Sequence, residues 1–275
     1  FCKAIHIHWP DRILLRKRSS LFKILLLTIY LFSLKVFRVK IIQTFHNDPE
    51  VFYSNHPFLK LYNLLIANLI DAYICPSSIG PLNKKTKKKT IAFIPLGLYP
   101  KIVNKKEIKK KYKYAILGRL TRKKNIIGQL TSASNLIKKH KGKLCISGRP
   151  DDDAYEEEIS LFLTNSGISY ETNFRFLEEK EFDYLVCQSE MVLIDNEVIT
   201  NSGVATKCIT YGVKILTKDE ILKESLLRDY QCEHIEFEGF YLITPPDFDS
   251  IKNLLITNRD DGSIIKKHIE IYESI

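Results

Sequence analysis

The chain has 275 residues, of which 45% are hydrophobic and 27% charged, so it can bury a large core and form two lobes. Its six cysteines contain no Cys-x-x-Cys pair, and several of them lie in apolar runs, where a free cysteine behaves as a small buried hydrophobe. This usage argues against a zinc site or a disulfide framework and fits a reducing compartment.

The net charge of +10 is divided unevenly along the chain. Residues 1–113 hold 22 Lys and Arg against 5 Asp and Glu, a net +17, whereas residues 114–275 hold 20 against 27, a net −7. The basic part fits either nucleic acid or an anionic membrane surface. Its lysine runs, 84–89 and 105–113, are interleaved with few aromatic residues, so we expect no nucleic-acid partner.

Elements of the first half follow in chain order from hydrophobic periodicity and turn signals. We predict a strand over 4–8, an apolar helix over 24–34, a strand over 39–45, a helix over 57–69, and strands over 72–75 and 91–94. The basic stretch 101–113 is the expected linker between the lobes.

The apolar run 24–34 is too short to span a membrane, which takes about 20 such residues. Basic residues flank it on both sides. It therefore fits either a buried helix or a helix that lies on the surface of a bilayer.

In the second half, strands alternate with helices, and this pattern predicts a parallel sheet with right-handed crossovers. The expected strands are 114–117, 143–147, 168–171, 191–194 and 214–216, and the expected helices are 126–140, 153–166, 179–189 and 204–211. The fold class is therefore α/β, with two Rossmann-like lobes at 1–113 and 114–275. Ligands of such sheets bind at the carboxyl ends of the strands.

Residues 118–125, Gly-Arg-Leu-Thr-Arg-Lys-Lys-Asn, form the most informative segment of the chain. They lie between a predicted strand and a predicted helix, where backbone N–H groups and an arginine fork can hold a diphosphate. This segment resembles the Gly-Arg-Leu-x-x-x-Lys-Asn/Gly segment of family-4 glycosyltransferases, which have the GT-B fold. The resemblance implies that Gly118, Arg119 and Lys124 bind the diphosphate of a sugar nucleotide.

Two further segments match the same family. Gly148 and Arg149 follow the strand that ends at residue 147, and the resemblance places them near the nucleotide, although an ordinary turn explains them equally well. Ser202, Gly203 and Val204 open a helix, as in a branch of the family where a Ser-Gly turn contacts the phosphates. A plain capped helix is the alternative interpretation.

The family's common Glu-x7-Glu pattern is missing, because Lys207 stands where the second glutamate, which binds the ribose, is expected. Asp195 and Glu197 are the nearest carboxylates upstream, and we assign Glu197 a catalytic role. His46 and Asn47 follow a predicted strand as in the family's Thr-x-His-Asn/Asp segment. The resemblance makes His46 a catalytic residue that contacts the transferred sugar and puts Asn47 in the cleft.

His8 ends the first strand in a pattern that resembles the family's Val-His-x-His strand, so we expect it to line the cleft. His6 shares a face with His8, but no third ligand has suitable spacing, and we expect no metal. The family's strands and glycine-rich loop that precede this strand are missing, so the amino-terminal lobe is expected to be truncated.

The resemblance implies a retaining hexosyltransferase that moves a sugar from a UDP- or GDP-sugar to a saccharide or lipid-linked acceptor during bacterial surface-polysaccharide assembly. Without cofactor or metal, Arg119 and Lys124 would offset the charge on the leaving diphosphate. We expect a cytoplasmic protein, peripheral on the inner face of the cell membrane. A non-catalytic partner subunit or decayed enzyme, and a sugar-nucleotide epimerase of the same fold, are the alternatives.

Overall fold

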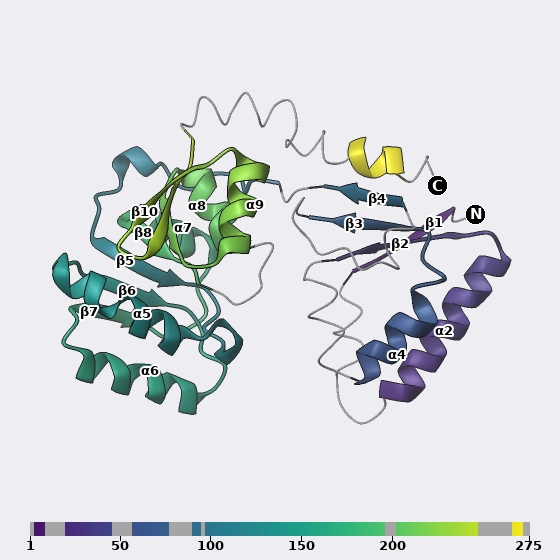
Figure 1. The fold of residues 1–275 in the computed structure, drawn as a ribbon, viewed down its shortest axis with the longest axis horizontal. Helices are drawn as coiled ribbons and strands as arrows, with labels where there is room; N and C mark the ends of the chain where they lie inside the picture. The colour runs from purple at the N-terminus through teal and green to yellow at the C-terminus, as the bar shows by residue number, and fades with distance from the viewer. Residues whose placement is uncertain are drawn as a thin grey trace. The chain divides into compact units, whose positions relative to one another are not determined.

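The computed structural model describes residues 3–8, 20–45, 57–76, 90–94, 97–195, 202–246 and 266–271. The chain forms two compact units (Figure 1). The first comprises residues 1–97 and 257–275, and the second comprises residues 98–256. Each unit has parallel strands flanked by helices, so the predicted α/β class is confirmed.

The first unit contains a four-stranded parallel sheet in the order β1-β2-β3-β4. Helices α2 and α4 pack on one face through a core around Ile24, Leu31 and Ile66, and the helical residues 266–271 contact the other face through Ile271. The bounds are β1 Ala4–Ile7, α2 Ser20–Val36, β2 Lys40–Thr44, α4 Pro57–Ile66, β3 Ala72–Cys75 and β4 Thr90–Phe93. Within the described ranges, no helix is long and apolar enough to cross a membrane.

The second unit contains a seven-stranded sheet in the order β10-β11-β9-β8-β5-β6-β7. The five strands from β9 to β7 are parallel, and β11 and β10 continue the sheet antiparallel. The bounds are β5 Tyr112–Leu117, β6 Leu144–Ser147, β7 Tyr170–Asn173, β8 Ser189–Leu193, β9 Lys214–Thr217, β10 Glu233–Phe237 and β11 Phe240–Thr244.

Helices cover both faces of this sheet (Figure 1). Helices α5 (Ile126–Lys139) and α6 (Asp153–Ser166) pack on one face, and α7 (Glu179–Gln188), α8 (Gly203–Tyr211) and α9 (Glu220–Tyr230) pack on the other. The central strands are buried on both sides, which explains their nearly continuous apolar sequences.

The predicted elements stop at Leu216, but α9 and the antiparallel hairpin β10–β11 follow β9. The hairpin turns at Glu238 and Gly239, which both have positive φ, 53° and 77°. Two such residues form the turn type whose twist matches paired strands. The second sheet is therefore mixed at this edge rather than wholly parallel.

The expected linker 101–113 belongs to the second unit, so the division lies between Gly97 and Leu98 instead of after Lys113. Val103 is buried in that unit's core. The Tyr211 hydroxyl accepts a hydrogen bond from the Ile102 amide at 2.9 Å. These contacts hold the basic segment on α8, and its charge alone did not reveal them.

Replacing Tyr211 with Phe tests this attachment. The Tyr211 hydroxyl also donates to the buried Asp183 carboxylate at 2.5 Å, so its loss leaves a buried carboxylate oxygen and a partly buried amide without this partner. We expect the free energy of unfolding, measured by urea denaturation, to fall by about 1–3 kcal/mol. Tyr170→Phe on β7, where the side chain is partly exposed, is the control and should change it by less than about 0.5 kcal/mol. Equal effects would contradict the attachment.

Candidate functional site

Two loops meet at the carboxyl ends of neighbouring strands β5 and β6. The Gly118 amide donates to the Ser147 carbonyl at 3.0 Å, and the Leu120 amide donates to the Arg149 carbonyl at 2.9 Å. The Asp151 amide then donates back to the Leu120 carbonyl at 3.1 Å. The loops after the two strands are thus joined along their backbones, which continues the parallel pairing of the strands.

Glycine is required where these loops touch. Gly148 has a φ of 148°, and a Cβ there would lie 1.7 Å from the Gly118 carbonyl oxygen. Gly118 itself has a φ of 94°. The backbones therefore approach more closely at Gly148 than any side chain permits, while Gly118 is favoured by its positive φ, and the two segments matched by sequence become one surface.

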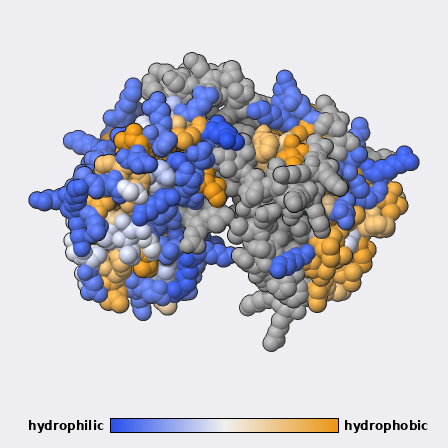
Figure 2. Space-filling view, in the orientation of Figure 1, coloured by the Kyte–Doolittle hydropathy of each residue, from blue (hydrophilic) through white to orange (hydrophobic). Residues whose placement is uncertain are grey.

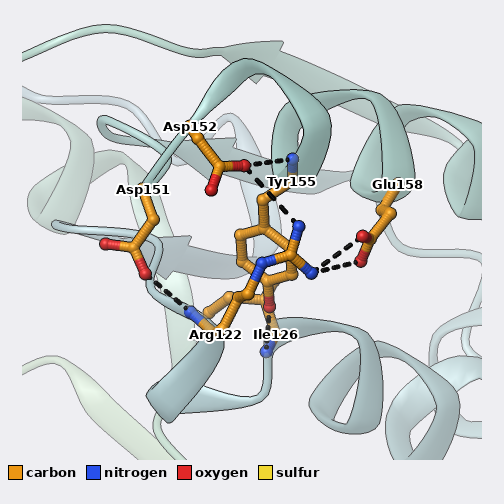
Figure 3. A network of polar contacts seen from close by, with 6 residues as sticks. All are labelled: Arg122, Ile126, Asp151, Asp152, Tyr155 and Glu158. Carbon is orange, nitrogen blue, oxygen red and sulfur yellow. Dashed lines mark hydrogen bonds and ion pairs between the residues drawn. The ribbon is translucent and has the colours of Figure 1, made fainter.

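A network of polar contacts fixes the first loop to α6 (Figure 3). The Arg122 guanidinium donates to both carboxylate oxygens of Glu158, at 2.7 and 2.9 Å, and lies 4.6 Å from the centre of the Tyr155 ring. The Arg122 amide donates to Asp151 at 3.0 Å. The Tyr155 hydroxyl accepts from the Ile126 amide at 3.0 Å, so the start of α5 is held as well.

The acidic residues between 151 and 158 therefore do more than form a solvent-exposed first turn of α6. Asp152 caps α6, because its side chain accepts from the Tyr155 amide at 2.8 Å, as expected for a helix amino terminus. Asp152 also lies 3.6 Å from the Arg122 guanidinium. Carboxylates of this run hold the basic loop in one conformation.

Side chains that cap two helical segments fix the backbone around Lys124. Residues 122–124 form a 3-10 turn, and the Thr121 hydroxyl accepts from the Lys124 amide at 3.2 Å. Asn125 has a positive φ of 46° and caps α5 by accepting from the Gly128 amide at 3.1 Å. The Lys124 carbonyl accepts from the Gln129 side chain at 2.6 Å, which fixes the backbone on both sides of the lysine.

The Lys124 ammonium and the start of α8 converge on Gly118. A Cβ placed on Gly118 would lie 4.0 Å from Lys124 Nζ, 3.5 Å from Val204 Cγ2 and 3.6 Å from Phe182 Cε2. Ser202 caps α8 by accepting from the Ala205 amide at 3.3 Å. The structure thus brings together the three segments that the sequence analysis singled out.

Positive charge is concentrated at this convergence. The Arg119 side chain is 73% exposed, and its guanidinium lies 3.3 Å from Asp151. Burial lowers the pKa of Lys124 below its ordinary value, and the positive charge of Arg119 lowers it further, while Asp151 opposes the shift. Both cations therefore act on the same small region, where an anion would be stabilised.

A pocket of about 560 Å³ opens beside the two loops. Its polar side contains the predicted residues Gly118, Arg119, Gly148 and Arg149. The sequence analysis missed the remaining lining residues, which are Pro150, Asp151, Phe176, Leu177 and Phe182. Phe176, Leu177 and Phe182 form an apolar wall of the pocket. The aromatic residues that follow the short strand β7 were the available signal.

Three predicted site residues, His46, Asn47 and Glu197, lie outside the described residues. His8 belongs to the first unit, where its ring centre lies 4.1 Å from that of His6. Burial, and then the charge of His268, lower the pKa of His8. In the parts of the chain that the structure describes, no group of three or more His, Cys, Asp or Glu side chains could hold a metal ion.

Lys207, which occupies the expected position of a glutamate, is buried and paired. Its ammonium lies 2.8 Å from Asp183, which is fully buried, and 2.9 Å from Glu179. The side chain of Lys207 is only 7% exposed. It therefore joins α8 to α7.

The contact between the two loops predicts a strong effect of Gly148→Ala. The new methyl group would overlap the Gly118 carbonyl, so the loops must separate, and we expect a loss of about 3–5 kcal/mol in the free energy of unfolding. Gly239→Ala is the matched control, since φ there is also positive but no atom lies within 4 Å of the added Cβ. It should cost about 1–2 kcal/mol. Chemical denaturation measures both, and similar losses would contradict the close contact.

No protein-family model matches the chain, and no curated protein matches its sequence. Solved structures do match. The pneumococcal O-GlcNAc transferase GtfA, in complex with UDP and GlcNAc, superposes with a TM-score of 0.54 at 14% identity, covering 90% of this chain and 51% of that one.

Two further structures agree with this likeness. A variant of TarM from S. aureus, in complex with fondaparinux, alpha-GlcNAc-glycerol and UDP, gives a TM-score of 0.58 at 12% identity, covering 91% of this chain and 59% of that one. Anabaena HepE in complex with UDP gives 0.52 at 10% identity, covering 70% and 57%. The chain thus spans a little over half the length of these proteins, and its fold is the GT-B fold of glycosyltransferases.

Proposed function

We propose that this protein is a glycosyltransferase that moves a sugar from a nucleoside-diphosphate sugar to a saccharide or lipid-linked acceptor. The observation that carries the proposal is the convergence of Lys124, Arg119 and the start of α8 around Gly118, which lines the pocket. The three similar structures each contain UDP, which favours UDP as the donor nucleotide and keeps GDP as the alternative.

The site has the chemistry that a diphosphate needs. An arginine offers two parallel N–H donors to phosphate oxygens, and the first N–H groups of a helix, here at Gly203 and Val204, face an anion. The contact between Arg119 and Asp151 is an exposed ion pair, which contributes only about 0–1 kcal/mol. A bound diphosphate can therefore displace Asp151 at little cost.

These cations also provide a route for the chemical step. As the sugar–phosphate bond breaks, negative charge develops on the leaving diphosphate, and preorganised cations lower the energy of that transition state. Arg119 and Lys124 would do this without a metal. Retention of the anomeric configuration, contact of His46 with the sugar, and the catalytic role of Glu197 belong to the same proposal and derive from the family resemblance.

The remaining lining suits a nucleoside. Gly148 and Arg149 line the same pocket as Gly118 and Arg119, where we place the diphosphate. The apolar wall formed by Phe176, Leu177 and Phe182 can cover the flat face of a base. Phe176 is 72% exposed, as expected for a ring that gains a partner only when a ligand is present.

Calorimetric titration with UDP and GDP tests the diphosphate assignment. We expect Arg119→Ala and Lys124→Ala each to weaken binding by about ten- to a hundredfold, because each removes a charge-assisted hydrogen bond. Lys123→Ala, in the same loop, is the control and should retain the affinity. Unchanged binding in both test variants would reject the site.

A transfer assay with UDP-sugars then separates the enzyme from its main alternative. Release of UDP that depends on acceptor would support the transferase. Donor binding without turnover would support a non-catalytic subunit of the same fold.

We also propose an anionic membrane surface as the partner of the first unit, at an inner membrane face where surface polysaccharide is assembled. Helix α2 is largely apolar around its circumference, and among the residues that the structure describes one side of it packs, against Ile41 and its neighbours. Figure 2 shows apolar side chains gathered over this helix. The exposed ones are Leu21, Phe22, Leu25, Leu26, Ile29, Tyr30, Phe32 and Val36.

Charge complementarity favours a bilayer as the occupant of this exposed side. The first unit, residues 1–97 and 257–275, holds 18 Lys and Arg against 8 Asp and Glu, a net +10, and exposed Arg38 lies two residues beyond the end of the helix. Each basic residue near an anionic surface contributes about 1 kcal/mol, although Lys35 is already paired with Asp71 at 2.7 Å. A helix of this kind lies in the interface with its apolar side among the lipid chains.

Ile29→Asp, at an exposed position of α2, tests the membrane proposal. Co-sedimentation with vesicles that contain phosphatidylserine should occur at low salt and fall steeply as salt rises, because the charges are screened. Ile29→Asp should reduce it several-fold, whereas Leu161→Asp, at a similarly exposed position of α6, should not. Binding that ignores salt and lipid charge would contradict the proposal, and concentration-dependent dimerisation would assign the surface to a second copy.

A further inference from the structure

The phenol of Tyr99 lies over the first turn of α8. A Cβ placed on Gly203 would be only 3.1 Å from the Tyr99 hydroxyl oxygen, so the hydroxyl occupies the space that a side chain at Gly203 would fill. The Tyr99 side chain is 38% exposed. A hydroxyl donor is thus placed beside the amino end of the helix at which the proposed diphosphate binds.

The ring of Tyr99 is held by a cation. The Lys207 ammonium lies 4.5 Å from the centre of the ring, within the range of a cation–π contact. Lys207 is fixed in turn by its ion pairs with Asp183 and Glu179. Burial by itself lowers the pKa of Lys207, but the hydrogen bonds to Asp183 and Glu179 raise that pKa above its ordinary value. The Lys207 ammonium therefore stays charged.

The buried carboxylate of Asp183 also fixes the backbone that follows Tyr99. Asp183 accepts from the Tyr211 hydroxyl at 2.5 Å, and that hydroxyl accepts from the Ile102 amide. The ring and the following backbone are therefore both tied to Asp183, one through Lys207 and the other through Tyr211. Such double attachment limits the positions that the Tyr99 hydroxyl can take.

We propose that Tyr99 is a further residue of the donor site, where its hydroxyl donates a hydrogen bond to the phosphate held at the start of α8, and that Lys207 is the residue that positions it. This inference rests on the proposed function. It gives a role to the lysine at residue 207: because its ammonium is engaged by Asp183, Glu179 and the aromatic ring, the residue acts through Tyr99 and does not itself contact the donor.

The first test is calorimetric titration of the full chain with UDP. Tyr99→Phe keeps the ring and its contact with Lys207 but removes the donor, and we expect UDP binding to weaken about tenfold. Tyr170→Phe, a partly exposed tyrosine on β7, is the matched control and should bind as the unmodified chain does. Unchanged affinity in Tyr99→Phe would overturn the role of Tyr99.

The second test addresses positioning by Lys207. Lys207→Arg keeps a cation over the ring and should retain most of the affinity, whereas Lys207→Met should lose it about as far as Tyr99→Phe does. In the Tyr99→Phe background, Lys207→Met should add little further loss, because there is no hydroxyl left to position. An equal loss in both backgrounds would show a merely structural lysine and overturn this part.

Gly203→Ala provides a variant that leaves the buried ion pairs intact. The new methyl group would press on the Tyr99 hydroxyl, so the loss of UDP affinity should be larger with Tyr99 present than in the Tyr99→Ala background. Equal losses in the two backgrounds would count against the contact.

Two failures are distinguishable. An unmodified chain that binds neither UDP nor GDP overturns the donor site itself and, with it, the role of Tyr99. Binding that is lost in Arg119→Ala but intact in Tyr99→Phe keeps the donor site and rejects only the inference.

Discussion

The contact between the Gly118 and Gly148 backbones is the constraint on which the site depends. A Cβ on Gly148 would lie 1.7 Å from the Gly118 carbonyl oxygen, so a side chain at that position would force the two loops apart. With Gly118 and Gly148 at the crossing, the loops continue the pairing of β5 and β6 past the end of the sheet. Arg119 and Arg149 then follow side by side, and both enter the lining of one pocket.

The cations around this crossing differ in how strongly they are paired with carboxylates. Arg122 is engaged by Glu158, Asp152 and the Tyr155 ring, which holds the loop to α6. Within the described part of the chain Arg119 pairs with one carboxylate, that of Asp151, and Lys124 lies close enough to Arg119 for their charges to interact. A strongly satisfied cation thus supports the loop, while its weakly paired neighbours remain available to an anion. Neighbouring basic residues that look alike in sequence differ in this way only because of what folds against them.

Buried polar groups connect the pocket side of the second unit to the segment that leads into it. Asp183 is fully buried and accepts from Tyr211 while it pairs with Lys207, so α7, α8 and residues 99–103 share one carboxylate. Breaking one partner of such a group is costly, since the remaining charge stays buried. Lys207, at the position where the sequence analysis expected a glutamate, is therefore part of this buried polar cluster.

Local pattern in the sequence determined the α/β class, nearly every strand and helix up to residue 216, and the loops at Gly118, Gly148 and Ser202, because hydrophobic period and turn residues are local properties. It did not reveal the β10–β11 hairpin, although Glu238-Gly239 is a turn signal between short alternating strands. Only the tertiary structure decided which cations are strongly paired and which weakly, that residues 98–113 belong to the second unit, that Phe182 lines the pocket and that Tyr99 lies beside Gly203. Those facts depend on contacts between residues far apart in the chain, and no local periodicity encodes such contacts.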